Sequence, residues 1–239
     1  MPTEPASNRY VFPQWVNYLL PLLVLGVVGG GLYVPVLVGL GASAKTLNAG
    51  YQPKQPVPYS HALHVGQLGI DCRYCHTTVE KAAMAAIPPT QVCMNCHNPE
   101  SGEAGIRKES AKLALLHESY RTGKPVEWIK VHDLPDYVYF NHSAHVNKGV
   151  SCVSCHGRVD KMEVVHQVHS LSMSWCLDCH RDPRPHLRPL DQVTNLAWQP
   201  PALEGETPQE AQLRIGAELM QKYQIHDATY MTSCSTCHR

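Results

Sequence analysis

The chain has 239 residues, with 20 acidic and 20 basic residues and a formal net charge of zero. This balance, without a run of lysines and arginines, argues against nucleic acid as a partner. Ten cysteines and fifteen histidines contrast with only two phenylalanines, so we do not expect a core of ordinary apolar side chains.

The first element is an apolar segment near the N-terminus. Residues 16–44 contain no charged residue and are rich in Leu, Val and Gly, and about 20 apolar residues suffice to span a bilayer. Trp15 and Tyr18 suit one membrane interface, while Pro21 and Pro35 predict a kink rather than a break. The segment therefore predicts a single transmembrane helix.

A cleaved signal peptide is the alternative for this segment. Residues 42–44 read Ala-Ser-Ala, which resembles a signal-peptidase site. The apolar stretch is longer than the core of about 7–15 residues in a typical signal peptide, and we therefore favour an uncleaved anchor. The expected division is a cytoplasmic N-terminal segment at 1–14, the anchor at 15–44 and one domain at 45–239.

All ten cysteines belong to five copies of Cys-x-x-Cys-His. Two thiols three residues apart lie on one side of a helical turn and can add to the two vinyl groups of a porphyrin, and the following histidine then faces the iron. This pattern is the attachment signature of c-type haem. The expected thioether residues are Cys72, Cys75, Cys93, Cys96, Cys152, Cys155, Cys176, Cys179, Cys234 and Cys237, and the proximal iron ligands are His76, His97, His156, His180 and His238.

Zinc sites and thioredoxin-like redox motifs are the alternatives for a Cys-x-x-Cys pair. Zinc sites combine two such pairs and need no histidine directly after each. Redox motifs occur singly, at a strand-to-helix turn. Five copies that use every cysteine favour five covalently bound haem c groups.

Distal ligands come from the other ten histidines, of which five are needed if every iron is six-coordinate. His61 with His64, and His142 with His145, have the spacing His-x-x-His. Histidines at this spacing share a helical face, so a pair can reach two neighbouring irons but not one iron twice. We expect the first histidine of each pair to serve the haem bound just downstream.

The fifth distal ligand is assigned to His132, which lies just upstream of the second pair. Met173 is the alternative, and a His/Met haem would have a higher potential than a His/His haem. His166 and His169 form another pair that stays open as ligands. The remaining histidines, expected at the surface or beside propionates, are His117, His186 and His226.

An internal repeat organises the haem-binding part. Residues 59–97 read Tyr-Ser-His-x-x-His, a haem motif, Val-Glu-Lys and a second motif, and residues 140–180 repeat this order with Phe-Asn-His-x-x-His and Val-Asp-Lys. The simplest description is two two-haem modules followed by a fifth haem. The expected parts are a haem-pair module at 57–97, a connecting segment at 98–131, a haem-pair module at 132–180, a Pro-rich linker and helix at 181–233, and the fifth haem at 234–239.

Between these motifs, residues 104–117 predict a short helix, and the proline-rich residues 182–201 predict an extended connection. Residues 207–210, Thr-Pro-Gln-Glu, form a capping box with proline at the first helical position, which predicts a helix to about Tyr223. Porphyrins would supply most of the core. The predicted fold is therefore mostly irregular with short α-helices, a multihaem cytochrome c fold organised around five haems, plus one N-terminal transmembrane helix.

Three linking segments carry a resemblance to a known family. They read Val131-His-Asp-Leu-Pro-Asp136, Phe140-Asn-His-Ser-Ala-His145 and Ser172-Met-Ser-Trp-Cys-Leu-Asp-Cys-His-Arg181. With one anchor and five haem motifs, the chain resembles, over nearly its whole length, the pentahaem cytochrome c subunit of alternative complex III, a quinol:electron acceptor oxidoreductase.

The resemblance implies electron transfer from quinol oxidation toward a periplasmic cytochrome c, a copper protein or a terminal oxidase. It implies four kinds of partner, namely the membrane, an iron–sulfur subunit related to molybdopterin oxidoreductases, polytopic quinol-binding subunits and a monohaem cytochrome c. The chain itself is not expected to be catalytic alone. Covalent haem attachment takes place outside the inner bacterial membrane, so we expect a single-pass protein of that membrane with its haem domain on the periplasmic side.

Two other functions stay open. A stand-alone membrane-anchored quinol dehydrogenase feeding a periplasmic reductase would need a haem with an open or weakly held distal position. A multihaem reductase of a nitrogen or sulfur oxyanion would need a five-coordinate haem, and the sequence has no Cys-x-x-Cys-Lys variant and enough histidines to saturate every iron.

Overall fold

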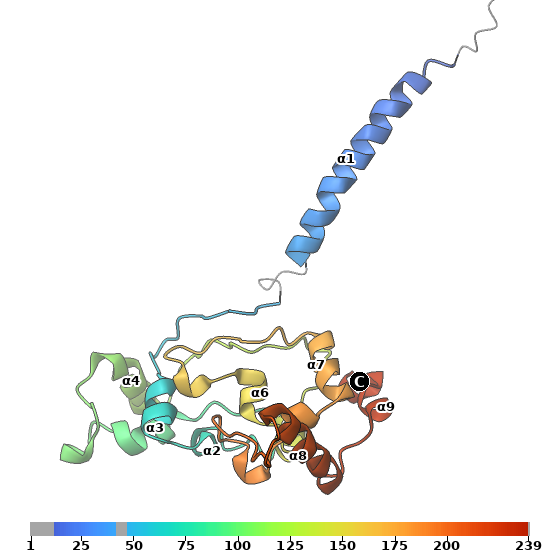
Figure 1. Ribbon diagram of the computed structural model, residues 1–239. Coiled ribbons are helices and arrows are strands. Elements are labelled where there is room, and N and C mark those ends of the chain that lie inside the picture. Colours follow the sequence, from blue (N-terminus) through green and yellow to red (C-terminus); the bar gives the residue numbers. More distant parts are fainter. Residues whose placement is uncertain (1–11, 42–46, 239) are drawn as a thin grey trace, which may run out of the picture. The chain divides into compact units, whose positions relative to one another are not determined.

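The computed structural model describes residues 12–41 and 47–238. The chain divides into two compact units, Met1–Thr46 and Leu47–Arg239. In the described residues, the first unit holds one long helix and the second holds short helices joined by irregular segments (Figure 1). Most of the expected N-terminal segment and the Ala-Ser-Ala sequence at 42–44 lie outside the described residues.

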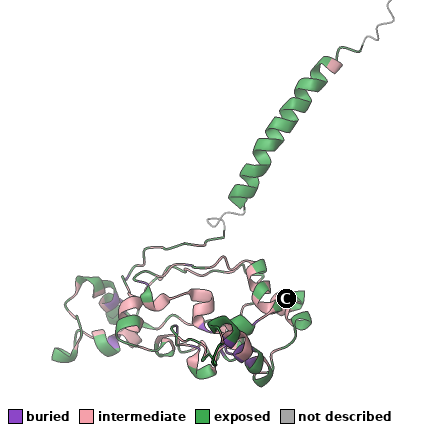
Figure 2. Ribbon diagram, in the orientation of Figure 1, coloured by how far each residue is buried: buried purple, intermediate pink, exposed green. Residues whose placement is uncertain are grey.

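Helix α1 (Val16–Gly41) is the apolar element expected near the N-terminus. Its 26 residues, at about 1.5 Å per residue, exceed the roughly 30 Å thickness of a hydrocarbon core. The helix continues through Pro21 and Pro35, and no residue of it is buried within its own unit (Figure 2). Among the described residues, α1 is the one helix long and apolar enough to cross a membrane.

The second unit is built from short helices around the cysteine motifs. Over residues 47–238 it has no strand, and Val150 and Leu187 form an isolated bridge. This agrees with the predicted mostly irregular, helical fold. The α-helices are α2 (Cys72–Cys75), α3 (Thr90–His97), α4 (Ala114–Thr122), α5 (His142–Val146), α6 (Cys152–His156), α7 (Met173–Arg181), α8 (Pro208–Lys222), α9 (Ala228–Met231) and α10 (Cys234–Cys237). The shorter turns are η1 (Ala62–Gln67), η2 (Gly102–Ala104), η3 (Ala111–Leu113), η4 (Val159–Lys161), η5 (Arg184–His186) and η6 (Leu190–Gln192).

Side-chain caps define where several of these helices begin. Asp71 accepts a hydrogen bond of 2.8 Å from the backbone N–H of Arg73 at the start of α2. Asn141, Ser172 and Asp227 cap α5, α7 and α9 in the same way. Such caps satisfy backbone N–H groups that a helix end leaves free, and two of the four capped helices, α2 and α7, carry cysteine motifs.

A small apolar core lies around α8, away from most of the motifs. Leu187 is fully buried and packs with Ile215 and Leu219 of α8. Gly216 permits the close approach of α8 to η5, because a Cβ atom there would lie 2.3 Å from the carbonyl oxygen of Arg184. Elsewhere in the second unit few side chains are buried (Figure 2).

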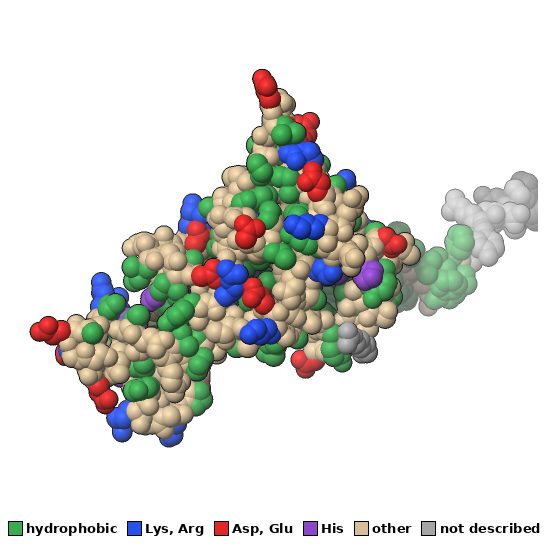
Figure 3. Space-filling model, turned by 90° about the horizontal axis from the view of Figure 1, so that it is seen from below, with side chains coloured by type: hydrophobic (Ala, Val, Ile, Leu, Met, Phe, Trp, Pro, Cys, Tyr) green, Lys and Arg blue, Asp and Glu red, His purple; other side chains and the backbone are tan. Residues whose placement is uncertain are grey.

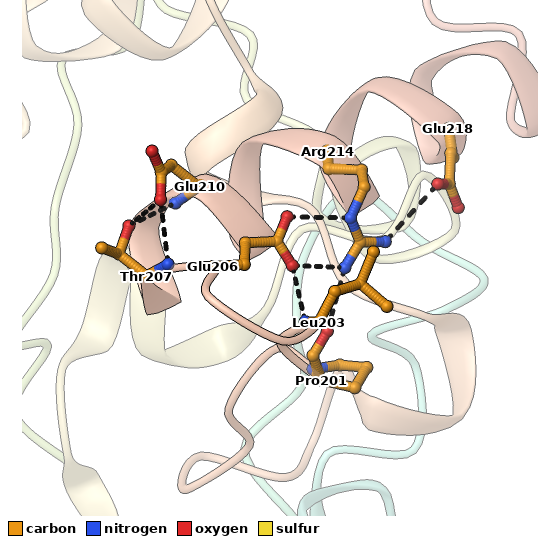
Figure 4. A network of polar contacts seen from close by, with 7 residues as sticks. All are labelled: Pro201, Leu203, Glu206, Thr207, Glu210, Arg214 and Glu218. Atoms are coloured by element: carbon orange, nitrogen blue, oxygen red, sulfur yellow. Dashed lines mark hydrogen bonds and ion pairs between the residues drawn. The ribbon is translucent and has the colours of Figure 1, made fainter.

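Helix α8 begins at the predicted capping box. The Thr207 hydroxyl accepts from the Glu210 N–H, and the Glu210 carboxylate accepts from the Thr207 N–H at 2.9 Å. Arg214 forms an ion pair of 2.9 Å with Glu206 and a longer one with Glu218 (Figure 4). These contacts hold the loop before α8 against its first turns, and the helix ends at Lys222, as expected.

The predicted helix at 104–117 is wrong over residues 105–110, which belong to no helix. Gly105 lies against the carbonyl oxygen of Asn98, and Arg107 has a positive φ of 50°. The Ile106 N–H donates to the carbonyl of Cys96 at 2.7 Å. The segment folds back over α3, and helix formation starts only at η3 and α4.

The connection at 182–201 is not extended as predicted. It contains η5 and η6, and its apolar residues Leu187, Val193 and Leu196 are buried. The Ser151 hydroxyl, which is also buried, donates to the carbonyl of Val193 at 2.7 Å. Burial of these side chains folds the segment onto the second module despite its prolines.

On the face drawn in Figure 3, basic and acidic side chains are interspersed, and neither sign of charge forms a patch of its own. Several arginines pair with nearby carboxylates, among them Arg73 with Asp71, Arg158 with Asp160, and Arg184 with Asp182. Exposed pairs of this kind contribute little to stability, but they balance the charge close to the motifs.

Candidate haem-binding sites

The five Cys-x-x-Cys-His motifs define five sites, which we number in chain order. Each motif lies on a helical turn, so its two cysteines share one side, as the attachment chemistry requires. All ten cysteines are free thiols. Site 1 contains His76, site 2 His97, site 3 His156, site 4 His180 and site 5 His238.

The histidines of four motifs are oriented by backbone carbonyls. In each, Nδ1 lies 2.7–3.0 Å from a carbonyl oxygen supplied by a distant loop. Donation from Nδ1 fixes the tautomer that leaves Nε2 free, which is the usual arrangement of a metal-bound histidine. The pairs are His76 with Ala86, His97 with Ile106, His180 with Met231, and His238 with Tyr137.

Three expected distal histidines face motif histidines at nearly equal spacings. The ring centres of His64 and His97 are 6.2 Å apart, those of His142 and His156 are 6.4 Å apart, and those of His145 and His180 are 6.1 Å apart. Two imidazoles that bind one metal from opposite sides at about 2 Å each have ring centres about 6 Å apart. The rings therefore fit a six-coordinate iron between them at sites 2, 3 and 4.

The distal histidines are oriented like the proximal ones. Nδ1 of His64, His142 and His145 lies 2.7–2.8 Å from the carbonyl oxygens of Ser60, Ala83 and Asn141 respectively. At site 1, His61 is a neighbour of His76, and its buried Nδ1 is among the polar atoms of the described residues that have no hydrogen-bond partner. Each His-x-x-His pair thus lies beside two motifs, with its first histidine beside the motif just downstream.

An aromatic ring precedes each pair and contacts both of its histidines. Tyr59 stacks on His64 with ring centres 4.4 Å apart and meets His61 edge-on at 4.7 Å. Phe140 does the same with His145 at 4.5 Å and His142 at 4.8 Å. Sequence reasoning did not assign a role to these two rings. The signal was present, because both precede the histidine pair by two positions in the internal repeat.

Burial keeps several of these imidazoles neutral. Loss of solvent lowers the pKa of His61 to about 4, with further contributions from His76 and His64. Burial also lowers the pKa of His156 to about 3, helped by the nearby His132, His142, His76 and His61. The neutral imidazole is the form that binds a metal, so the environment prepares these side chains for ligation at neutral pH.

The thiols behave unlike those of a redox motif. Burial raises the pKa of Cys155 to about 12 and that of Cys179 to about 11. Reactive Cys-x-x-Cys motifs depend on a lowered pKa at the attacking thiol. Of the motif cysteines with a shifted pKa, Cys72 alone is lowered, through a hydrogen bond with Cys152. These half-buried, neutral sulfur atoms suit thioether formation better than thiol–disulfide exchange.

Site 5 lies beside Met173 in the structure. A largely apolar hollow is lined by Met173, Leu134 and Val138 together with Cys234, Cys237 and His238. His132, the distal ligand predicted from the sequence, lies instead against His156, with ring centres 4.4 Å apart and planes at 79°. That spacing is too short for a shared iron, and its buried Nε2 has no partner among the described residues.

The other histidines make local contacts. His169 stacks on Trp175 with ring centres 5.2 Å apart, and His226 packs on Tyr230 at 4.1 Å. Nε2 of His117 lies 2.9 Å from the carbonyl oxygen of His97, beside site 2. His117 is thus a positioning contact for the site 2 loop, which the sequence did not suggest.

Part of the chain is similar to known cytochromes. Residues 57–112 match the family described as cytochrome c7 and related cytochrome c. A protein of Nitratidesulfovibrio vulgaris named menaquinone reductase, multiheme cytochrome c subunit, is 35% identical over 126 residues, which is 53% of this chain and 56% of the relative. The high-molecular-weight cytochrome c of the same organism is 30% identical over 122 residues, covering 47% of this chain and 22% of the relative.

The chain therefore spans about half the length of the first relative and about a fifth of the second. Over the matched part it is homologous to multihaem c-type cytochromes, in which haem c is covalently bound. The side-chain arrangement described above fits that cofactor.

Proposed function

We propose that this multihaem cytochrome c homologue carries five haems and conducts electrons between a quinol-oxidising partner and an acceptor outside the membrane. Thioether bonds would form at the ten motif cysteines, with the five motif histidines as proximal ligands. Distal ligands would be His61, His64, His142 and His145 at sites 1 to 4. At site 5 we propose Met173, with His132 as the alternative raised by the sequence.

One observation carries this proposal, namely the ring spacing of 6.1–6.4 Å in three proximal–distal histidine pairs. Each pair would hold an iron from both sides, which would leave no position where a substrate could bind. An iron of this kind can gain and lose an electron but cannot activate a bound oxyanion or peroxide. Electron transfer is therefore better supported than reductase chemistry.

When bound, haem c supplies one-electron redox chemistry at a potential set by its axial ligands and surroundings. The chain's own residues hold that chemistry in place. Backbone carbonyls at Ala86, Ile106 and Met231 accept from the proximal imidazoles and would leave Nε2 free to bind the iron. Tyr59 and Phe140 restrict rotation of the distal rings, so little reorganisation accompanies a change of charge.

The link to quinol rests on the first relative and on the family resemblance. That relative is named as a subunit of menaquinone reductase, and three linking segments resemble the pentahaem subunit of alternative complex III. We propose membership of a complex of the latter type. Its partners would be an iron–sulfur subunit related to molybdopterin oxidoreductases, polytopic quinol-binding subunits and a monohaem cytochrome c, with a terminal oxidase or a soluble carrier as acceptor.

Helix α1 would anchor this chain in the inner bacterial membrane. Its apolar side chains are exposed along the whole helix, for example Leu20, Val27 and Leu40, and such a surface is stable in a bilayer or against other membrane helices rather than in water. Haem attachment outside that membrane would place the second unit on the periplasmic side.

A stand-alone quinol dehydrogenase is the second candidate, and Met173 is the observation that favours it. The Met173 side chain is 64% exposed, and a thioether is a weaker axial ligand than an imidazole. Displacement of Met173 would open the iron of site 5 to a reductant. In that case the chain would oxidise quinol itself.

An EPR spectrum of the oxidised, full-length holoprotein, together with its haem content per chain, tests the proposal. Five haems that are all low-spin would support a conductor whose quinol site lies on a partner. A high-spin signal of about a fifth of the total would indicate an open iron and would favour the dehydrogenase. Fewer than five haems would overturn the assignment of all motifs as attachment sites.

A further inference from the structure

We propose that the five haem sites lie in the spatial order 2–1–3–4–5, so that sites 2 and 5 form the two ends where electrons enter and leave the chain. This proposal rests on the proposed function, in which every motif carries a haem. The order departs from the chain order at one point, because site 1, rather than site 2, adjoins site 3.

Sites 1 and 3 meet at the residues that precede their first cysteines. The Thr194 hydroxyl donates to the Asp71 carboxylate at 2.9 Å, and the Ser151 hydroxyl donates to the carbonyl of the adjacent Val193 at 2.7 Å. Asp71 and Ser151 come directly before Cys72 and Cys152. Because each cysteine would mark an edge of a bound porphyrin, the edges of sites 1 and 3 would be adjacent.

Hydrogen bonds between the two modules explain this contact. The Ala62 N–H donates to the Met162 carbonyl at 3.0 Å, and the Ser143 N–H donates to the Ala82 carbonyl at 3.2 Å. Ala62 corresponds to Ser143, and Ala82 to Met162, in the internal repeat. The two bonds are therefore the same contact made in both directions.

A second reciprocal contact agrees with the first. The Asn147 side chain donates to the carbonyl of Glu80 at 2.9 Å, and Gly66, its counterpart in the repeat, lies directly against the carbonyl oxygen of Asp160. Contacts that are repeated with the modules exchanged define a local twofold relation. Cys72 and Cys152 are themselves counterparts, and the residues just before them are joined through Val193 and Thr194, so the twofold axis passes between the two motifs. The first site of each module lies at this axis.

The second site of each module lies beyond its first. In the first module, the Asn95 side chain donates to the Tyr74 hydroxyl at 2.8 Å, which joins the motif of site 2 to that of site 1. In the second module, His142 and His145 of helix α5 face His156 of site 3 and His180 of site 4, with ring centres 6.4 and 6.1 Å apart. Sites 2 and 4 thus flank the central pair on opposite sides.

Site 5 continues the series from site 4. Nδ1 of His180 lies 2.8 Å from the carbonyl oxygen of Met231, just before α10. Cys176 and His180 of site 4 line the same hollow as Cys234, Cys237 and His238 of site 5. No other site is interposed between these motifs.

Exposure of the cysteines marks the two ends. Cys96 of site 2 and Cys234 of site 5 are exposed, whereas the other eight motif cysteines are partly covered. A haem edge near an exposed attachment point is accessible to an electron donor or acceptor on another protein. Sites 1, 3 and 4 are therefore conducting positions within the chain.

Nuclear Overhauser contacts between haem substituents in the fully reduced, full-length holoprotein test this order. Before the experiment, mass spectrometry establishes whether five haems are present, which tests the proposed function separately. We expect contacts between sites 2 and 1, 1 and 3, 3 and 4, and 4 and 5. Contact between sites 2 and 3, without contact between 1 and 3, would overturn the order even in a protein with five haems.

Ligand variants give a second measurement that does not depend on those contacts. His64→Met should raise the midpoint potential of site 2, so that this haem is reduced at a higher potential than in the parent. The charge of the reduced haem acts most strongly on its neighbour, so among the other four sites only site 1 should show a shifted midpoint potential. His61→Met, which changes site 1, should shift the midpoint potentials of both site 2 and site 3. As the matched comparison, His145→Met, which changes site 4, should shift the midpoint potentials of sites 3 and 5. A shift at site 3 in His64→Met as large as that at site 1 would contradict the proposal.

Discussion

Tyr59 stacks on His64 with ring centres 4.4 Å apart and an interplanar angle of 23°. The same ring holds His61 edge-on, so one aromatic side chain restrains the two histidines proposed as distal ligands of sites 1 and 2. Phe140 occupies the equivalent position beside His142 and His145. The tyrosine hydroxyl is not needed for this role, since phenylalanine serves in the second module.

Replacement of the stacking ring should loosen both distal imidazoles. We expect Tyr59→Leu to weaken distal ligation at sites 1 and 2 by about 0.5–1.5 kcal/mol, the usual contribution of an aromatic pair. EPR of the oxidised holoprotein should show broadened or shifted low-spin signals from two haems. Tyr59→Phe is the matched control and should leave the spectrum as in the parent. An unchanged spectrum in Tyr59→Leu would show that the ring does not orient the ligands.

Removal of a single distal histidine should change a single haem from low-spin to high-spin. His64→Ala should make site 2 high-spin, about a fifth of the total iron, because His64 is the ring facing His97 at 6.2 Å. His226→Ala, which removes a histidine packed on Tyr230, is the control and should leave all haems low-spin. Absorbance near the high-spin charge-transfer band and EPR both report the change. Retention of a wholly low-spin spectrum in His64→Ala would contradict the ligand assignment.

Variants of Met173 and His132 should show which of the two residues is the distal ligand at site 5. Met173→His should lower the highest midpoint potential of the holoprotein by on the order of 100 mV, because imidazole replaces a thioether. Met173→Ala should make site 5 high-spin. His132→Ala is the comparison variant, and we expect it to leave site 5 low-spin, since His132 packs on His156. High-spin iron at site 5 in His132→Ala, with no change in Met173→Ala, would reverse the assignment.

The first motif should lose stability in acid. A hydrogen bond from Arg73 lowers the pKa of Asp71 to about 2, compared with about 3.9 in an unfolded chain. The ionised carboxylate therefore stabilises the folded state above about pH 4, and this contribution is lost as the pH falls toward 2. Because the pair is exposed, we expect less than about 1 kcal/mol.

Urea unfolding at several pH values, followed by circular dichroism, measures this contribution. The difference in unfolding free energy between the parent and Asp71→Asn should be constant from pH 5 to 7 and should shrink below about pH 4. Asp178→Asn, which affects an exposed ion pair with Arg181, is the control. A difference that grows in acid would have the wrong sign for a lowered pKa.

The apolar core around α8 should tolerate no added volume at Gly216. A Cβ atom there would lie 2.3 Å from the carbonyl oxygen of Arg184, so Gly216→Ala should destabilise the second unit by about 1–3 kcal/mol despite the better helix propensity of alanine. Gln221→Ala, at an exposed position of the same helix, should change the unfolding free energy by less than about 0.5 kcal/mol. Thermal unfolding followed by circular dichroism compares the two variants. A neutral or stabilising Gly216→Ala would show that α8 can move away from η5.

The sequence by itself determined the chemistry of the chain. The motif Cys-x-x-Cys-His predicts the cofactor from five consecutive residues, because attachment and proximal ligation need only residues within one helical turn. The apolar helix and the capping box of α8 are local in the same sense. Helix α1 begins within one residue of the predicted start of the anchor, and α8 ends within one residue of its predicted end. The histidine pairs were visible because their spacing and their repeat are also local.

Tertiary structure decided which sites are neighbours. The proximity of the first motif to the third arises from two modules that exchange backbone hydrogen bonds, and no local pattern encodes such an exchange. The same reason explains the failed predictions. Residues 104–110 give up helical hydrogen bonds to contact α3, and the segment containing Leu187 and Val193 folds because those side chains are buried. The place of Met173 beside His238, and of His132 beside His156, likewise depends on packing between segments far apart in the chain.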